Sequence, residues 1–325
     1  MPTHTATALA HPNIAFIKYW GNRDENLRLP VNPSLSMNLA GLETVTTVTF
    51  DAELAEDEVV IGNQVQSGWP KHRVSAHLDL FRARAGVNTK AHVTSNNNFP
   101  AGAGIASSAS AFAALSVAAA AAVGLTLSEA ELSALARRGS GSASRSIPSG
   151  FVEWHMGTGD EDSFATSLAG PEHWPLADVV AVISKTHKTT GSTEGHALAG
   201  TSALQAARVA SAEERLQRCK MALMARDFDA FAEIVELDST TMHAVMMTSN
   251  PPLYYWEPQT LAVMKHIRAW RAAGLPVCFT VDAGANVHCL TLQEHTETLI
   301  QNLRALEIHE TLIALPGGPA RVVRV

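Results

Sequence analysis

Residues 96–116, NNNFPAGAGIASSASAFAALS, decide how this chain folds. Asparagine, proline and glycine give way to an unbroken alanine-rich pattern, which predicts a loop that runs directly into the first turn of a helix. Gly102 and Gly104 let the main chain approach a ligand, and Ser107 and Ser108 place hydroxyl groups where the helix exposes unpaired N–H donors. Because the helix dipole favours an anion there, the stretch predicts a phosphate-binding loop.

The alternative interpretation of this stretch is an ordinary loop followed by a helix whose small residues serve only packing. The stretch has no lysine after Gly104, so it does not match the G-x-x-x-x-G-K-[ST] loop. It also does not fit the G-x-G-x-x-G fingerprint that follows a strand in dinucleotide-binding folds. A phosphate-binding fold of another kind is therefore required.

Composition narrows the class of protein. A chain of 325 residues with 46% hydrophobic residues can bury a large core in one or two domains. The net charge of −7 provides no basic field for nucleic acid or an anionic membrane. Three cysteines, widely spaced and odd in number, favour neither a disulfide framework nor a zinc site, and they indicate a reducing compartment. With no visible signal peptide and no apolar run long enough to span a bilayer, we expect a cytoplasmic protein.

The order of predicted elements indicates an α+β protein in two parts. The apolar patterns predict strands at residues 5–18, 34–39, 45–50, 58–61, 91–95, 176–184, 277–281 and 287–291, and two more at the C-terminal end around PGGP. They predict helices at residues 71–85, 107–123, 129–139, twice within 201–237 with a continuation to 249, and at 259–273 and 294–306. Because composition shifts near Thr190, we expect parts spanning 1–190 and 191–325 with a cleft between them.

Three further features could meet in that cleft. Lys18 stands beside two aromatic residues, Arg145 lies in the serine-rich segment GSGSASRSIPSG, and Asp282 opens the tight turn DAGAN. Each has an ordinary alternative: a surface lysine, a flexible linker and an Asx-type turn, respectively. If they meet, the cleft combines a phosphate-binding loop, a cation, an arginine that can clamp a carboxylate and a possible base. This combination suits phosphoryl transfer to a hydroxyl of an acidic substrate.

Four stretches carry a resemblance to a known family. They are residues 12–39 (PNIAFIKYWGNRDENLRLPVNPSLSMNL), 97–115 (NNFPAGAGIASSASAFAAL), 137–154 (RRGSGSASRSIPSGFVEW) and 279–287 (FTVDAGANV). In this order they resemble the mevalonate diphosphate decarboxylase family, within the galacto-, homoserine, mevalonate and phosphomevalonate kinase superfamily. The resemblance implies a two-part GHMP-kinase-like fold with the active site in a deep cleft, and an ATP-dependent decarboxylation of a 5-phosphorylated mevalonate.

The resemblance also implies roles for individual residues. Asp282 would orient or deprotonate the C3 hydroxyl, Lys18 would lie near the C3 oxygen, and Arg145 would grip the substrate carboxylate. Further substrate contacts are implied for Tyr19, Asn22, Ser140, Ser142 and Ser192. ATP with Mg²⁺ would be bound by Asn98, Pro100, Gly102, Gly104, Ser107 and Ser108. No metal-ligand spacing is visible, so the residues that hold Mg²⁺ stay unassigned. A homodimer is common in the family.

One departure from the family pattern concerns the number of phosphates on the substrate. Members that act on the diphosphate commonly read KYWGK, and here the last position is Asn22. A charge-assisted contact is roughly twice as strong as a neutral one, so the change removes part of the preference for two phosphates. We therefore expect mevalonate 5-phosphate as substrate and isopentenyl phosphate as product, in isoprenoid biosynthesis. Arg23 or the loop of residues 185–188 could compensate, which leaves mevalonate 5-diphosphate as the alternative.

Two other functions fit the same residues less well. A mevalonate kinase would stop after phosphorylation, but a carboxylate clamp at Arg145 argues for decarboxylation, and release of CO₂ distinguishes the two. A ligand sensor without catalysis would require Lys18 and Asp282 to be incidental. Neither nucleic acid nor a membrane is expected as a partner.

Overall fold

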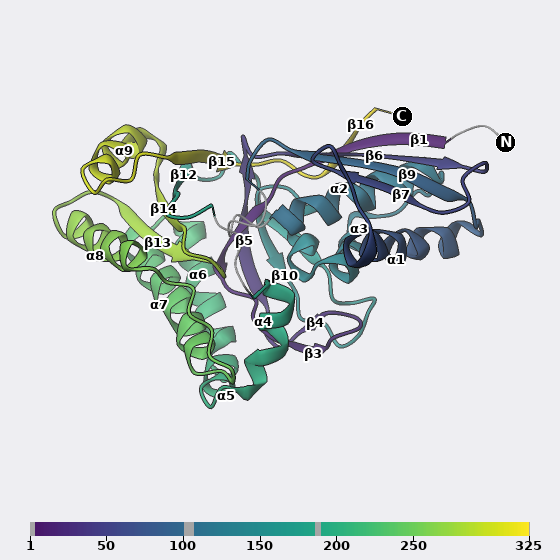
Figure 1. Ribbon diagram of the computed structural model, residues 1–325. Coiled ribbons are helices and arrows are strands. Elements are labelled where there is room, and N and C mark those ends of the chain that lie inside the picture. Colours follow the sequence, from purple (N-terminus) through teal and green to yellow (C-terminus); the bar gives the residue numbers. More distant parts are fainter. Residues whose placement is uncertain (1–3, 101–106, 186–189, 325) are drawn as a thin grey trace.

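The computed structural model describes residues 4–100, 107–185 and 190–324. In this part of the chain two large sheets, each with its own helices, form two parts that meet near the middle of the molecule (Figure 1). The N- and C-terminal ends of the described chain lie close together on the first sheet. The predicted α+β class is confirmed.

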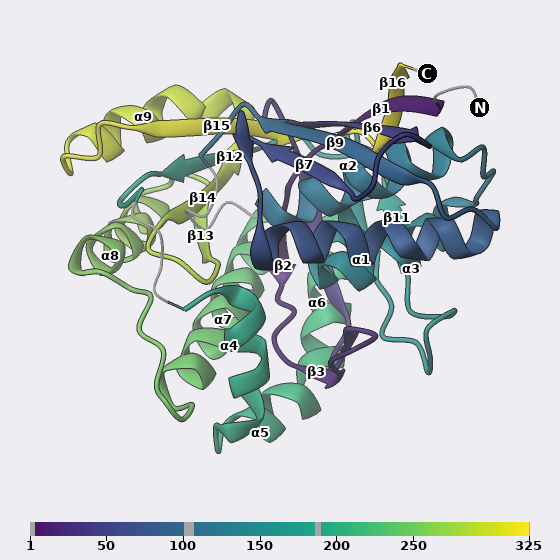
Figure 2. The same cartoon turned by 45° about the vertical axis from the view of Figure 1, so that its right-hand side comes forward.

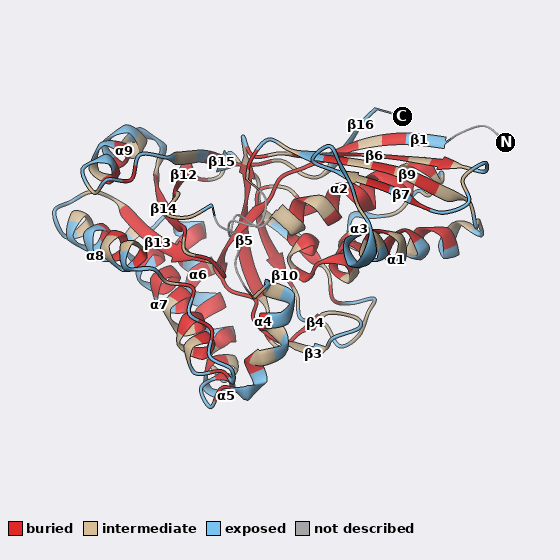
Figure 3. Ribbon diagram, in the orientation of Figure 1, coloured by how far each residue is buried: buried red, intermediate tan, exposed pale blue. Residues whose placement is uncertain are grey.

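The first sheet has the strand order β16-β1-β6-β9-β7-β8. Its strands are β1 (His4–Ala10), β6 (Thr44–Asp51), β7 (Glu58–Ile61), β8 (Gln64–Val65), β9 (Lys90–Asn97) and β16 (Arg321–Arg324). Helix α2 (Ser107–Ala122) packs directly on β1 and β6, and α1 (Gly68–Ala85) and α3 (Glu129–Gly139) pack against α2 (Figure 2). Small alanine side chains let α2 lie close to the sheet, and most of the helix is buried (Figure 3).

The second sheet has the strand order β11-β10-β5-β15-β12-β14-β13, with β2 also paired to β5. Its strands are β2 (Asn13–Ile17), β5 (Ser34–Ala40), β10 (Phe151–Trp154), β11 (Ala165–Ala169), β12 (Leu176–Ala181), β13 (Val277–Val281), β14 (Val287–Leu292) and β15 (Thr311–Pro316). Helices α6 (Ala212–Ala225), α7 (Phe228–Met247) and α8 (Pro258–Ala272) pack against β2 and β13. Helix α9 (Thr296–Arg304) packs against β12 and β14, so the central strands are buried on both faces.

Two strands near the C-terminal end return to the first half of the chain. Strand β15 pairs with β5 on one side and β12 on the other, whereas β16 pairs with β1. The expected boundary between residues 190 and 191 falls between β12 and α4 (Ser192–Leu198), and strands from both sides of it share the second sheet. The division into 1–190 and 191–325 stays a prediction.

Individual residues show how several short segments are built. Ser128 caps α3 and exchanges hydrogen bonds with Glu131 in a capping box. The serine-rich segment forms a buried 3₁₀ helix, Gly141–Ser146, and is not a flexible linker. The shorter elements β3 (Asn22–Asp24), β4 (Leu29–Pro30), β11 and α4, with single turns of 3₁₀ helix at Ala199–Thr201 and Gln293–His295, were not expected from the sequence. The first of the two helices expected within residues 201–237 is divided into α5 (Gln205–Ala210) and α6.

The structure also shows the state of the three cysteines and whether any described helix could span a membrane. Cys219, Cys278 and Cys289 are buried and free, and burial raises the pKa of each thiol well above its ordinary value. Among the described residues, no helix combines the length and the apolar character that crossing a membrane would need.

Candidate active site

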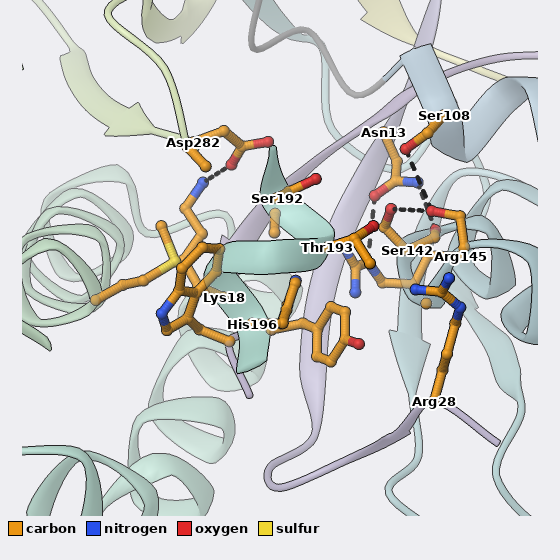
Figure 4. A pocket seen from close by; sticks show the side chains of 17 residues that line it. Asn13, Lys18, Arg28, Ser108, Ser142, Arg145, Ser192, Thr193, His196 and Asp282 are labelled. Atoms are coloured by element: carbon orange, nitrogen blue, oxygen red, sulfur yellow. Dashed lines mark hydrogen bonds and ion pairs between the residues drawn. The ribbon is translucent and has the colours of Figure 1, made fainter. Parts of the chain in front are cut away.

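A pocket lies where the two parts meet, and it collects most of the predicted site residues (Figure 4). They come from the segment after β2, the first turns of α2 and α4, the buried 3₁₀ helix and the turn after β13. The predicted residues that line the pocket are Lys18, Tyr19, Ser108, Ser140, Ser142, Arg145, Ser192 and Asp282. Segments far apart in sequence are thus brought to one place.

Lys18 and Asp282 form an ion pair at one end of the pocket. The Lys18 Nζ lies 2.5 Å from the Asp282 Oδ1, and the side chains are 2% and 26% exposed. Burial alone would raise the pKa of Asp282, but the positive charges of Lys18, His288 and Arg145 hold that pKa below its ordinary value. Asp282 is therefore an ionised carboxylate at neutral pH. Its side chain pairs with Lys18, whereas the alternative prediction from the sequence was that it only forms an Asx-type turn.

Helix α7 fixes the position of Asp282. The preceding residue, Val281, donates its N–H to Ser239 Oγ at 2.9 Å, and its carbonyl accepts from His243 Nε2 at 3.2 Å. Burial lowers the pKa of His243 to about 4, so the ring is neutral at physiological pH. Because both hydrogen bonds go to the main chain next to Asp282, they hold the backbone that positions its carboxylate.

A buried polar network fixes the main chain at Lys18. Asp238 of α7 is fully buried and accepts from the Lys18 N–H and from Arg215 Nε, each at 2.7 Å. Arg208 of α5 donates to the Lys18 carbonyl at 2.7 Å. The same guanidinium donates to the Trp20 carbonyl at 3.2 Å. These groups hold the lysine backbone from both sides.

Arg145 is a buried cation whose hydrogen bonds go to neutral groups. Its side chain donates to Asn13 Oδ1 at 3.2 Å and to Ser34 Oγ at 2.6 Å. Burial lowers the pKa of Arg145 to about 10 in spite of the nearby Asp282 carboxylate, so it stays charged at neutral pH. Within the described chain no carboxylate forms an ion pair with it. A buried guanidinium without a counter-ion is suited to bind an anionic ligand.

Ser142 of the 3₁₀ helix and Ser140, which precedes it, line the pocket together with Ser108 of α2. Ser140 Oγ lies 3.2 Å from Ser108 Oγ and 3.5 Å from Ser142 Oγ, so three hydroxyl groups form a row. Gly141 separates two of them, and a Cβ there would lie 2.5 Å from the Tyr19 ring. Glycine is therefore required where the segment passes the aromatic ring.

Tyr19 joins the pocket to Asn22, which does not itself line it. The Tyr19 hydroxyl donates to Asn22 Oδ1, and Asn22 Nδ2 donates to Glu25 Oε2 at 2.8 Å. Burial raises the pKa of Tyr19, so the phenol is protonated. Its ring stacks on His196 in the last turn of α4, with ring centroids 4.1 Å apart, and this contact holds against the pocket the helix that begins at Ser192.

The predicted phosphate loop is described only in part. Gly102 and Gly104 lie outside the described residues, and Ser107 and Ser108 form the first turn of α2, where only Ser108 lines the pocket. The side chain of Asn98 forms hydrogen bonds with the main chain of two residues that do not line the pocket. Its Nδ2 donates to the Gly41 carbonyl at 3.0 Å, and its Oδ1 accepts from the Glu43 N–H at 2.8 Å. Pro100 does not line the pocket.

Some pocket residues were not predicted: Asn13, Arg28, Thr193, His196 and Met242. Asn13 and Arg28 fall inside the stretch 12–39 that carried the resemblance, but no residue-level signal separated them from their neighbours. The others come from α4 and α7, whose approach to the pocket depends on tertiary packing. Among the described residues, no group of three or more His, Cys, Asp or Glu side chains could hold a metal ion by itself.

Replacing Lys18 with Met should raise the pKa of Asp282. Without the ammonium, the largest opposing charge is lost and burial favours the neutral carboxyl group, so the pKa of Asp282 should rise. Because the ionised carboxylate is the form present at neutral pH, the acid limb of residual kcat/KM should move to higher pH by the same amount. Lys71→Met on α1, whose lysine pairs with Glu56, is the matched control and should leave the limb in place. An unmoved limb in Lys18→Met would show that the ion pair does not set this pKa.

Comparison with known proteins identifies the family of this chain. Residues 10–165 match the diphosphomevalonate decarboxylase-like N-terminal domain, and residues 178–314 match the mevalonate 5-diphosphate decarboxylase C-terminal domain. A diphosphomevalonate decarboxylase from Candida albicans is 38% identical over 87% of this chain and 83% of its own length. A phosphomevalonate decarboxylase from Haloferax volcanii is 35% identical over 98% of this chain and 97% of its own length.

A solved structure supports the same relationship. MDDEF in complex with MVAPP, AMPPCP and magnesium has a TM-score of 0.94 and 37% sequence identity, and the match covers 100% of both chains. The expected two-part fold of this family is thereby confirmed. The match to both domains and to more than four fifths of each relative's length shows that the chain belongs to the diphosphomevalonate decarboxylase family, which includes a relative named phosphomevalonate decarboxylase.

Proposed function

We propose that the protein catalyses the ATP-dependent decarboxylation of mevalonate 5-phosphate, with isopentenyl phosphate, ADP, phosphate and CO₂ as products. The observation that carries this proposal is a single pocket with the Lys18–Asp282 ion pair and a buried Arg145. Family membership supports an ATP-dependent decarboxylase that acts on a phosphorylated mevalonate. The cytoplasmic location and the homodimer stay predictions.

Arg145 and Asp282 would position the substrate. The substrate carboxylate would bind the Arg145 guanidinium, whose charge is otherwise uncompensated by an ion pair in the described chain. The C3 hydroxyl would donate to the Asp282 carboxylate. Because the pKa of Asp282 is low, this carboxylate is a weak base, so it orients the hydroxyl and accepts its proton late, as the new P–O bond forms.

The nucleotide would approach from the N-terminus of α2. The positive end of the α2 helix dipole and the Ser108 hydroxyl would favour its phosphates there. Mg²⁺ would neutralise charge on the transferring phosphoryl group, and it usually binds through one or two carboxylates together with substrate phosphates. Asp282, which lines the pocket, supplies a carboxylate of the kind that this pattern requires.

After transfer to the C3 oxygen, the phosphate would leave and the carboxylate would be lost. The C3–O bond breaks with its electron pair on the departing phosphate, and the C1–C2 electron pair forms the C2–C3 double bond as CO₂ departs. The Lys18 ammonium, held beside Asp282, would stabilise the negative charge on the leaving phosphate. Arg145 would keep the carboxylate aligned until the bond breaks.

Asn22 and Glu25 support the choice of a monophosphate. The position that could carry a second cation holds an asparagine whose amide donates to the Glu25 carboxylate at 2.8 Å. A carboxylate near this position would repel the extra charge of a diphosphate. This arrangement weakens the reason to prefer two phosphates.

Mevalonate 5-diphosphate is the second candidate substrate. The relatives found are named diphosphomevalonate decarboxylase more often than phosphomevalonate decarboxylase, and on that ground they support the diphosphate more broadly. Sequence identity does not discriminate, because relatives with either name are 34–38% identical to this chain.

The decisive measurement compares kcat/KM for the two substrates, followed as phosphate and CO₂ release with ATP and Mg²⁺. We expect the monophosphate to be turned over faster at equal, limiting concentration. Asn22→Lys should shift the ratio toward the diphosphate, by about 10-fold for one charge-assisted contact. Asn63→Lys, on the β7–β8 turn, is the control and should leave the ratio unchanged. A wild-type preference for the diphosphate would refute the monophosphate proposal, and ADP formation without CO₂ would refute decarboxylation.

A further inference from the structure

Arg28 reaches the pocket from the segment between β3 and β4. It lines the pocket, and in Figure 4 it lies at the opposite end from the pair of Lys18 and Asp282. Its Nε donates to the Arg138 carbonyl at the end of α3, at 3.1 Å. Among the described residues, its terminal amino groups have neither a hydrogen-bond acceptor nor an acidic partner. The outer edge of the guanidinium is thus available to a ligand.

The backbone of Arg28 adopts an uncommon conformation. Its φ is 51°, in the left-handed region that residues other than glycine, asparagine and aspartate seldom occupy. Such a conformation costs on the order of 1 kcal/mol and persists only where the surrounding structure enforces it. The contact to Arg138 turns this strained residue toward the pocket.

Arg28 also adds positive charge to an already basic region. Burial, together with the charge of Arg28, lowers the pKa of Arg73 to about 10. Burial likewise lowers the pKa of His77 to about 3, with contributions from Arg73, Arg138 and Arg28. Arg138 is paired with Asp160 at 3.0 Å, whereas Arg28 has no such partner in the described chain. An anion beside Arg28 would relieve this repulsion.

We infer that Arg28 binds the phosphate on C5 of the substrate. This inference rests on the proposed function, in which Arg145 takes the carboxylate and Asp282 the C3 hydroxyl. The remaining polar group of the substrate is the C5 phosphate, and Arg28 is a cation at the end of the pocket away from Asp282. With Nε held by Arg138, the two terminal amino groups of the guanidinium can donate to two phosphate oxygens together.

The test measures the Kd of the substrate by calorimetry without ATP, and the KM of ATP in the full reaction. Arg28→Asn removes the cation and keeps a residue that tolerates a positive φ. It should raise the Kd of the phosphorylated mevalonate that the wild type uses by about 10- to 100-fold, the value of one charged contact, with the KM of ATP unchanged. Arg28→Lys should recover part of the affinity. Arg226→Asn is the matched control, because Arg226 has φ 56° at the end of α6, and it should change neither constant.

Two outcomes would overturn the inference. One is an unchanged Kd in a folded Arg28→Asn protein, and the other is an equal loss for the substrate and for ATP, which would indicate a general collapse of the pocket. The choice between monophosphate and diphosphate is read from the wild type alone. A wild type that prefers the diphosphate would refute the proposed substrate, while the Arg28 test would proceed on the diphosphate.

Discussion

Asp282→Asn should lower kcat by a factor on the order of 10² to 10⁴, the range for loss of a group that accepts a proton in the transition state. The amide has the shape of the carboxylate, but it carries no charge and cannot accept the proton of the C3 hydroxyl. Substrate affinity should change much less, because Arg145 is untouched. Stopped assays of ADP and CO₂ formation would give kcat, and calorimetry would give the Kd.

The pairing with Lys18 calls for a second variant. In Asp282→Asn the ammonium of Lys18, with a side chain 2% exposed, would lose its counter-ion, and a loss of activity could then arise from local rearrangement. The double variant Lys18→Met/Asp282→Asn removes both charges together. It should be folded and as inactive as the single variant, whereas recovery of activity would show that the unpaired lysine, and not the missing carboxylate, caused the defect.

Asp238→Ala should destabilise the protein by about 3 to 5 kcal/mol, the cost of removing one partner from a buried ion pair. Asp238 is 0% exposed and accepts from Arg215 Nε and from the Lys18 N–H. Its loss would leave a buried guanidinium unpaired and a main-chain donor unsatisfied. Urea denaturation would measure the change in the free energy of unfolding.

Two comparisons separate this effect from simple helix weakening. Asp229→Ala, in the exposed first turn of the same helix, should cost less than about 1 kcal/mol. The double variant Arg215→Met/Asp238→Leu removes the charges together and should regain much of the lost stability. If Asp238→Ala proved as mild as Asp229→Ala, the network would not be what fixes the Lys18 backbone.

Local patterns in the sequence predicted most elements of the fold. Strand β7 and helix α3 were predicted with the bounds that the structure has, because Glu58–Ile61 is a short apolar run between turns and Ser128 is a clear N-cap. Strands β3 and β4 are only 3 and 2 residues long, too short to show a periodicity. The sheet to which each C-terminal strand belongs was also hidden, because pairing over long separations leaves no local pattern.

The sequence predicted several of the residues that line the candidate site, but not the buried residues that hold them in place. Lys18, Arg145 and Asp282 stand in distinctive short stretches, and the pocket brings them together. Asp238 and Arg208 lie on helices with ordinary composition, and their importance comes from burial and from contacts about 190 to 220 residues away in sequence. Arg28 gave no signal either, because its reach into the pocket depends on a left-handed backbone that sequence spacing does not reveal.

The position of β15 has a consequence for synthesis on the ribosome. This strand, Thr311–Pro316, joins β5 to β12, so until it has left the exit tunnel the second sheet exists as two separate ribbons. The emerging polypeptide must keep the apolar edges of β5 and β12 unpaired while more than a hundred residues are added between β12 and β15. Exposed edges of this kind pair readily with other strands, so the newly made chain is prone to aggregation until β15 has emerged.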